Sequence, residues 1–117
     1  MVRDDSMRPT LIPGDRLWVD PRPARQGRFA RGEIVVARDP DGSGRHLLKR
    51  VVGLADDPIG DGRRVPDGSV YLEGDDRERS RDSRTFGPVA LDAILAVAWF
   101  RYFPADRRGP IGPGTLK

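Results

Sequence analysis

The chain has 117 residues, a formal net charge of +3 and no cysteine, so we expect one small domain without disulfides or thiolate chemistry. A single histidine argues against a structural zinc site, and no stretch approaches the roughly 20 apolar residues that cross a bilayer. Arginine alternates with aspartate and glutamate along the chain, which favours a solvated surface over nucleic-acid binding, and the many glycines and prolines favour β structure.

The first half of the chain predicts three strands. Residues 16–20 alternate and are rich in strand formers, whereas residues 21–32 carry proline, glycine and arginine without periodicity and are expected to form an exposed loop. Residues 33–38 form a short apolar run typical of a buried strand. A turn cluster follows, so residues 45–54 are expected to pair back antiparallel to that strand.

The second half predicts two further strands. Residues 69–73 form a short strand, and residues 74–87 are polar, with no run able to enter a core. Residues 91–98 fit helical spacing but lead into a strand-forming run, so we expect a short helical turn and then a final strand that ends at Pro104. The tail of residues 105–117 has little to bury and is expected to be disordered.

Lys49 stands out because 19 of the 21 basic residues are arginine, and the only other lysine is Lys117 at the end of the chain. Lys49 lies in an apolar stretch of the expected hairpin. A desolvated lysine can become a neutral amine near pH 7, which arginine cannot. Ser6 lies on a turn-forming segment and could present its hydroxyl to such a base. A serine nucleophile activated by a lysine is therefore our first hypothesis.

His46 is the rival base, because a serine and histidine pair is the commoner solution among proteases. Strand alternation lets only one of His46 and Lys49 face Ser6. Lys49 shares its face with Leu47 and Val51, which are candidates for desolvating it. We expect His46 to be a partly exposed polar residue.

Four segments resemble the sequence boxes of the type I signal peptidase family. Ser6 to Asp15 (SMRPTLIPGD) resembles the nucleophile box, and residues 32–36 (GEIVV) resemble the strand between the catalytic boxes. Residues 49–53 (KRVVG) resemble the lysine box, and residues 74–87 (GDDRERSRDSRTFG) resemble the last box. The self-cleaving domains of LexA-type repressors share the first box but lack the last one.

The resemblance implies a mainly antiparallel β fold, barrel-like and with one short helical turn, as a catalytic domain over residues 1–104. Ser6 would be the nucleophile, and Lys49 the general base and then the general acid. Ser80 would orient the lysine amine. Asp82 and Arg84 would form an ion pair that fixes the loop near the site. No metal or cofactor is implied.

Two positions depart from the family pattern. The backbone N–H of Ser6 is the expected donor to the oxyanion, but Asp4 stands where some members carry an assisting hydroxyl, and we assign it no role. Asp76 replaces the asparagine of the last box. The larger apolar residues near the nucleophile line either the substrate cleft or a membrane-facing rim, or else pack in the core: Met7, Leu11, Ile12, Leu17 and Trp18.

These features predict a serine endopeptidase that removes leader or pro-segments from protein substrates bound as an extended strand. The short form resembles the proteases that mature nickel-type superoxide dismutase. The alternatives are the catalytic domain of a membrane signal peptidase, a LexA-like domain that cuts its own chain, and an inert β module. Only five residues precede Ser6, so we expect a cytoplasmic location without an anchor. Membrane association through an upstream anchor, peripheral membrane contact and the oligomeric state are left open.

Overall fold

The computed structural model describes residues 1–60 and 62–113 of the chain. These residues form a seven-stranded antiparallel sheet of order β1-β8-β2-β3-β6-β7, and β9 also pairs with β8. The strands are β1 (Arg16–Asp20), β2 (Ile34–Arg38), β3 (His46–Gly53), β6 (Ser69–Glu73), β7 (Val89–Ala90), β8 (Ile94–Phe103) and β9 (Gly109–Pro110), while β4 (Pro58–Ile59) and β5 (Arg63–Arg64) form a separate ladder. The predicted mainly β fold is confirmed.

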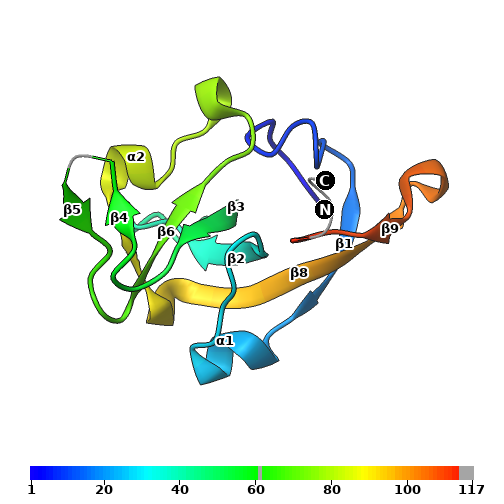
Figure 1. The fold of residues 1–117 in the computed structure, drawn as a ribbon. Helices are drawn as coiled ribbons and strands as arrows, with labels where there is room; N and C mark the ends of the chain where they lie inside the picture. The colour runs from blue at the N-terminus through cyan, green and yellow to red at the C-terminus, as the bar shows by residue number, and fades with distance from the viewer. Residues whose placement is uncertain (61, 114–117) are drawn as a thin grey trace.

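The helices of the described residues are all short. They are α1 (Arg22–Gln26), η1 (Arg77–Arg79), α2 (Ser83–Phe86), η2 (Leu91–Ala93) and η3 (Ala105–Arg107). We expected one helical turn, so the chain is more helical than predicted. Figure 1 shows β8 crossing the whole molecule, with β1 and β9 near one end and β6 and β2 toward the other. Among the described residues, none of these helices has the length and apolar character needed to cross a bilayer.

The β2–β3 hairpin forms as predicted, and it sets the position of Lys49. Lys49 pairs with Val35 on β2, at the middle of a regular register. On its other edge β3 pairs with β6 only from Arg50 to Gly53. Lys49 therefore lies just past the end of β6, where the edge of β3 has no strand partner within the described residues.

Two apolar clusters lie on opposite faces of the sheet, because neighbouring residues of a strand point to opposite sides. On β2, Val35 and Ala37 belong to the larger cluster and Ile34 to the smaller one. The larger cluster contains Val35, Ala37, Val51, Val70, Leu72, Val89, Ile94 and Val97. The smaller one contains Val2, Met7, Leu11, Ile34, Ala98 and Ile111. The smaller cluster thus holds the segment on both sides of Ser6.

The expected transition near residue 94 is confirmed. Leu91–Ala93 forms the 3-10 turn η2, and β8 then runs to Phe103, directly before Pro104. The apolar residues of β8 serve both faces, since Ile94 and Val97 enter the larger cluster and Ala98 the smaller. A strand buried on both faces has a nearly continuous apolar sequence, which explains its ambiguous periodicity.

Two segments differ from the prediction. Residues 21–32 contain the helix α1, which has a proline in its first turn and ends at Gly27 with a positive φ of 62°. Proline at the start and glycine at the end favour a single helical turn that is too short to show periodicity. The segment is exposed as expected, since α1 has no buried residue.

The expected disorder of residues 105–117 is wrong for residues 105–113. This part forms η3 and β9, and the N–H of Ile111 donates a hydrogen bond to the carbonyl oxygen of Trp99 at 3.0 Å. Ile111 is only 7% exposed and packs in the smaller cluster. One apolar side chain and the pairing with β8 order a segment whose composition is mostly polar. Residues 114–117 lie outside the described part.

Candidate active site

Ser6 lies in a compact N-terminal turn that is anchored on both sides. The N–H of Leu11 donates to the carbonyl oxygen of Met7 at 2.9 Å, and Val2 exchanges backbone hydrogen bonds with Gly14 and Asp15. Met7 and Leu11 are almost completely buried. Burying two such side chains contributes about 1.5 to 3 kcal/mol each, so hydrophobic packing holds the turn on the sheet. Ser6 itself is only 3% exposed.

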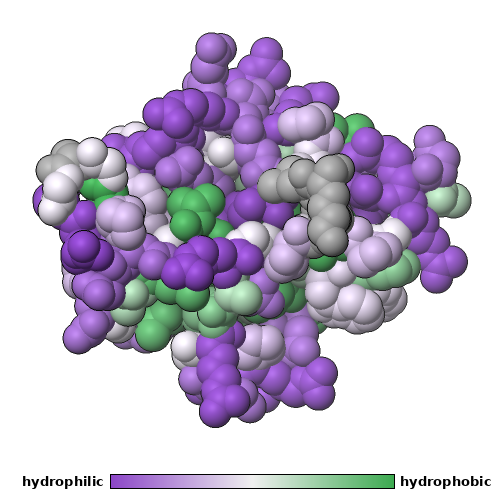
Figure 2. Space-filling model, in the orientation of Figure 1, coloured by the Kyte–Doolittle hydropathy of each residue, from purple (hydrophilic) through white to green (hydrophobic). Residues whose placement is uncertain are grey.

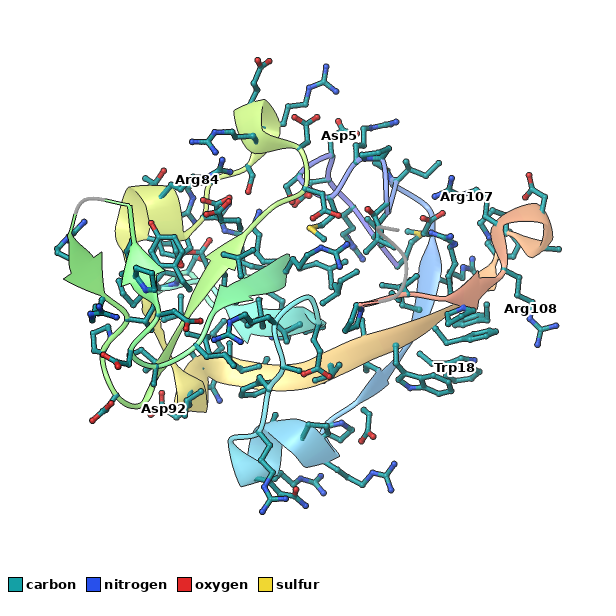
Figure 3. All side chains as sticks on the ribbon, in the orientation of Figure 1. Asp5, Trp18, Arg84, Asp92, Arg107 and Arg108 are labelled. Atoms are coloured by element: carbon teal, nitrogen blue, oxygen red, sulfur yellow. The ribbon has the colours of Figure 1, made fainter. Side chains whose placement is uncertain are left out.

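A buried aspartate at the end of this segment fixes it to the C-terminal strands. Asp15 accepts a hydrogen bond from the N–H of Ile12 and ion-pairs with Arg101 and Arg107 at 3.3 and 3.0 Å. Both arginines also donate to the carbonyl oxygen of Thr10. Figure 3 shows Arg107 projecting from the end of the molecule where β1 and β9 lie. Arg107, which lies in the segment that we predicted to be disordered, therefore helps to hold the Ser6 turn.

Arg50 forms a second clamp, between the turn and the hairpin strand that carries Lys49. Its guanidinium forms two parallel hydrogen bonds to the carboxylate of Asp75, at 2.9 and 2.8 Å, and Thr10 donates to the same carboxylate at 2.6 Å. Arg50 also donates to the carbonyl oxygens of Gly32 and Gly112. Since bidentate arginine and carboxylate pairs fix geometry as well as charge, this network links β3 to the Ser6 turn through Asp75 and Thr10.

Lys49 is buried, with 3% of its surface exposed, and its Nζ donates a hydrogen bond to Ser80 Oγ at 3.1 Å. Burial is the largest influence on its pKa and lowers it from the ordinary lysine value. The carboxylates of Asp4 and Asp82 act in the opposite direction, and the guanidinium groups of Arg81 and Arg84 lower the pKa further. Val51, which we named as a desolvating neighbour on the same strand face, is fully buried, and Leu47 is half-buried.

Ser80 connects Lys49 to a completely buried carboxylate. The hydroxyl of Ser80 donates to Asp82 Oδ2 at 2.5 Å, so its oxygen lone pairs are free to accept from Lys49 and from the N–H of Gly74. Asp82 also accepts from Gly74 N–H and forms an ion pair with Arg84 at 2.6 Å. Burial would raise the pKa of Asp82, but these hydrogen bonds lower it to about 2. Asp82 is therefore a stable anion at neutral pH.

Gly74 brings Ser6 and Ser80 together. A Cβ atom at position 74 would lie 2.2 Å from Ser80 Oγ and 2.6 Å from the carbonyl oxygen of Ser6. Only a residue without a side chain fits between the two serines. The N–H of Asp76 then donates to the Ser6 carbonyl at 2.8 Å, so residues 74–87 are bonded directly to the Ser6 turn.

Asp4 makes the closest contacts of the Ser6 side chain. Ser6 Oγ donates to Asp4 Oδ1 at 2.9 Å, and the N–H of Ser6 donates to the same oxygen at 3.0 Å. Within the described residues no hydrogen bond joins Ser6 directly to Lys49. The backbone carbonyl oxygen of Ser6 borders Gly74, and the Lys49 amine is hydrogen-bonded to Ser80. The charge of Asp4 raises the pKa of Lys49.

An open groove lies beside this cluster. Its volume is about 690 Å³, and its lining includes Asp4, Met7, Leu17, His46 and Leu47. It runs past residues 46–48 of β3, in the part of the strand that pairs only with β2 among the described residues. A strand edge without a strand partner, beside a groove lined by both apolar and charged residues, is a suitable site for an extended peptide.

The other residues that we singled out have different environments in the structure. Met7 and Leu17 line the groove, Ile12 is half-buried near the turn, and Leu11 is a core residue. Trp18 is 54% exposed and packs against Tyr102 at a ring-centroid distance of 4.7 Å. Figure 3 shows Trp18 beside β1. Figure 2 shows hydrophobic residues in separate small areas of the face seen in Figure 1, most of them below its centre.

His46 is exposed at the start of β3, whereas Lys49 is buried three residues later.

Sequence reasoning did not identify Asp15 and Arg50, the two buried charged residues that bind the Ser6 turn to other parts of the chain. Arg50 carried one usable signal, since it is a second basic residue inside an apolar run. Because neighbouring residues of a strand point to opposite faces, the side chains of Lys49 and Arg50 lie on opposite sides of the sheet.

Comparison with known proteins identifies a family for almost the whole chain. The family model described as signal peptidase, peptidase S26, matches residues 1–60 and 57–103. Mitochondrial ATP-independent inner membrane protease subunit 1b of Arabidopsis thaliana is 38% identical over 120 residues, covering 92% of this chain and 71% of the relative. The human mitochondrial inner membrane protease subunit 1 is 32% identical, covering 93% of this chain and 71% of the relative.

Bacterial proteins match as well. Probable signal peptidase I-1 of Synechocystis is 31% identical over 148 residues, with 98% of this chain and 76% of the relative covered. A solved structure of a signal peptidase I from Enterococcus faecalis superposes with a TM-score of 0.50 at 22% identity, covering 60% of this chain and 96% of that chain. The solved structure supports the similarity of fold.

Proposed function

Since the chain belongs to the signal peptidase family, peptidase S26, and is a serine endopeptidase, we propose that it removes leader or pro-segments from protein substrates with Ser6 and Lys49 as its catalytic pair. The observation that carries the proposal is the environment of Lys49. A buried lysine with a lowered pKa is hydrogen-bonded to Ser80, which borders the nucleophile turn across Gly74.

The proposed reaction begins with a neutral Lys49. Its amine takes the proton of the Ser6 hydroxyl as Oγ attacks the carbonyl carbon of the scissile peptide bond. The protonated lysine then gives this proton to the leaving nitrogen as the carbon–nitrogen bond breaks, which leaves an acyl-enzyme on Ser6. Water, deprotonated by Lys49, hydrolyses the ester and restores the serine.

Ser80 and Asp82 would orient the base in this scheme. Because the Ser80 proton is directed to Asp82, Ser80 can only accept from Lys49. One N–H of the amine is thereby fixed, and its lone pair is left for the Ser6 proton. Arg84 would act indirectly, by holding Asp82 in place through their ion pair.

The substrate would bind as an extended strand along the free edge of β3 at residues 46–49. The adjoining groove offers apolar surface from Met7, Leu17 and Leu47, which suits the side chains of a leader segment. The resemblance to signal peptidases favours cleavage after small side chains. A nickel-type superoxide dismutase precursor and a secretory precursor are both candidate substrates.

The relatives named as mitochondrial inner membrane proteases favour the membrane-associated alternative over the cytoplasmic location that we expected. Fractionation of cells that express the complete gene product would distinguish them. Recovery in the membrane fraction after a high-salt wash supports association with the membrane, and recovery in the soluble fraction supports the cytoplasmic location.

The proposal is tested with purified protein and leader-bearing precursors of both kinds, followed by mass spectrometry of the products. We expect one defined cut in the wild type, loss of cleavage in Ser6→Ala and Lys49→Met, and retained cleavage in the matched control His46→Ala. Loss in His46→Ala with retention in Lys49→Met would reverse the assignment of the base. Cleavage only of the enzyme's own chain would favour a self-processing domain, and no cleavage an inert module.

A further inference from the structure

The contacts of Asp4 conflict with the needs of catalysis. Ser6 must offer its backbone N–H to the oxyanion that develops on the scissile carbonyl, and its hydroxyl proton to the base. In the structure both groups donate to Asp4 Oδ1. A carboxylate oxygen therefore occupies the position in which Ser6 N–H would meet the negatively charged oxygen of the transition state.

Asp4 also acts on the base. The charged groups around Lys49 come from two segments: Asp4 from the N-terminal turn, and Arg81, Asp82 and Arg84 from the end of the loop after β6 and the start of α2. Asp82 is completely buried and fully hydrogen-bonded, so it stays charged and in place. Asp4 is exposed and can turn into solvent. Its negative charge favours the protonated form of Lys49, which cannot accept the Ser6 proton.

The position of Asp4 supplies a route for its removal. Asp4 lines the groove beside the free edge of β3, so a peptide strand bound there contacts it directly. The scissile carbonyl must approach Ser6 N–H, and it cannot do so while Asp4 Oδ1 accepts that hydrogen bond.

We propose that Asp4 holds the free enzyme in a resting state by binding both donors of Ser6, and that the substrate strand displaces its carboxylate into solvent before the reaction. The inference rests on the proposed roles of Ser6 and Lys49. Asp4 is thus a positioning residue that restrains the catalytic pair, and its removal should activate the enzyme.

The chain allows a direct measurement of the effect on Lys49. Lysine occurs only at positions 49 and 117, so selective ¹³C labelling of lysine gives two signals, which Lys117→Arg assigns. The pH titration of the Lys49 signal reports its protonation without any substrate. We compare the wild type with Asp4→Asn, which removes the charge but keeps an acceptor oxygen, and with Asp4→Ala, which removes both. Asp5→Asn is the matched control, because it makes the same change of charge one residue away. Asp5 ion-pairs with Arg8.

We expect the Lys49 titration to shift to lower pH in both Asp4 variants and to stay unchanged in Asp5→Asn. The pH at which kcat/KM reaches half its maximum should shift in the same direction. At neutral pH, kcat/KM should rise by a factor of about 3 to 10, the range that corresponds to the net strength of one hydrogen bond, and more in Asp4→Ala than in Asp4→Asn. A merely structural role for Asp4 would not move the titration.

An unchanged Lys49 titration in both variants would overturn the inference, whether or not the enzyme cleaves. Loss of activity in well-folded Asp4 variants would also overturn it, because Asp4 would then be required for the reaction. A wild type that cleaves no leader substrate refutes the proposed function instead, and this failure is seen before any Asp4 variant is compared.

Discussion

The larger apolar cluster and the region around Ser6 depend on different interactions, although Met7 and Leu11 also pack the Ser6 turn into the smaller cluster. The larger apolar cluster, with residues such as Val35, Leu72 and Ile94, is held by hydrophobic burial, which has no preferred direction. The region around Ser6 is held by charge-assisted hydrogen bonds, in which Arg50 and Asp82 each bind several partners. Hydrophobic packing has no preferred direction and is enough to form the sheet, whereas directional polar contacts fix the positions of the groups around Ser6 and Lys49.

The largest effect is expected from Gly74→Ala, which disturbs the polar region without removing any hydrogen-bonding side chain. The new methyl group would overlap Ser80 and the Ser6 backbone, so one of the two must move. A displacement of about 1 Å lowers catalysis by about 100-fold, and we expect kcat/KM to fall at least this much. Assays with a leader peptide, beside thermal unfolding, measure both effects.

Gly42→Ala is the matched control for this variant. Gly42 has a φ of +78° and no atom near its Cβ position, so alanine there strains the turn but touches nothing. It should lower the free energy of unfolding by about 1 kcal/mol and leave kcat/KM unchanged. Equal activity losses in the two variants would show that Gly74 has no special role at the site.

A second pair of variants compares the two regions directly. Arg50→Met leaves Asp75 without its bidentate partner and should lower the free energy of unfolding by about 3 to 5 kcal/mol. Ile94→Ala creates a cavity in the larger cluster and should cost about 2 to 5 kcal/mol. Urea denaturation measures both values.

The two variants should differ in activity although their stabilities are similar. At a temperature where both are folded, Arg50→Met is expected to lower kcat/KM, because the polar link from β3 through Asp75 to Thr10 of the Ser6 turn is broken. Ile94→Ala should keep the wild-type value. If Ile94→Ala loses as much activity as Arg50→Met, the claim that only the polar region controls the geometry of the site is wrong.

The smallest effect concerns acid stability. The pKa of Asp82 is lowered to about 2 in the folded protein, below the value of about 3.9 in an unfolded chain. A carboxyl group with a lowered pKa contributes its stability above the unfolded pKa and loses it as the pH falls through the folded one. Asp82 should therefore contribute about 2 kcal/mol that disappears between about pH 4 and pH 2.

Urea denaturation at several pH values tests this, with Asp82→Asn as the comparison. The variant should be less stable than the wild type at pH 7, and the difference should shrink toward pH 2. A difference that stays constant over this range would mean that Asp82 does not titrate with a lowered pKa in the folded protein.

Much of the fold could be predicted because its signals are local. The apolar run of β2, the turn after it and the alternation of β3 lie close together in the sequence, and they form the expected hairpin with Lys49 on it. The helix α1 and the ordered segment after Pro104 were missed. The former is too short for periodicity, and the latter is ordered by pairing with β8 and by burial of Ile111.

For the candidate site, the sequence predicted which residues take part, and their catalytic roles stay a prediction. Lysine at position 49 in an arginine-rich chain, the serine segment and the polar last box each carry recognisable chemistry. It did not reveal that Arg50 binds Asp75, or that Asp15 binds Arg101 and Arg107. These partners are 25 to 92 residues apart along the chain, and no local pattern links them.

The sequence by itself determined the strands, the hairpin and the chemical types available at the site, because each follows from the propensities and spacing of neighbouring residues. Tertiary structure decided which of these groups meet. Only the folded chain places Gly74 between two serines, orients Ser80 through Asp82 and brings Asp4 onto Ser6. Burial and distance set the pKa of Lys49 and the hydrogen bonds of Ser6, and both are properties of the folded chain.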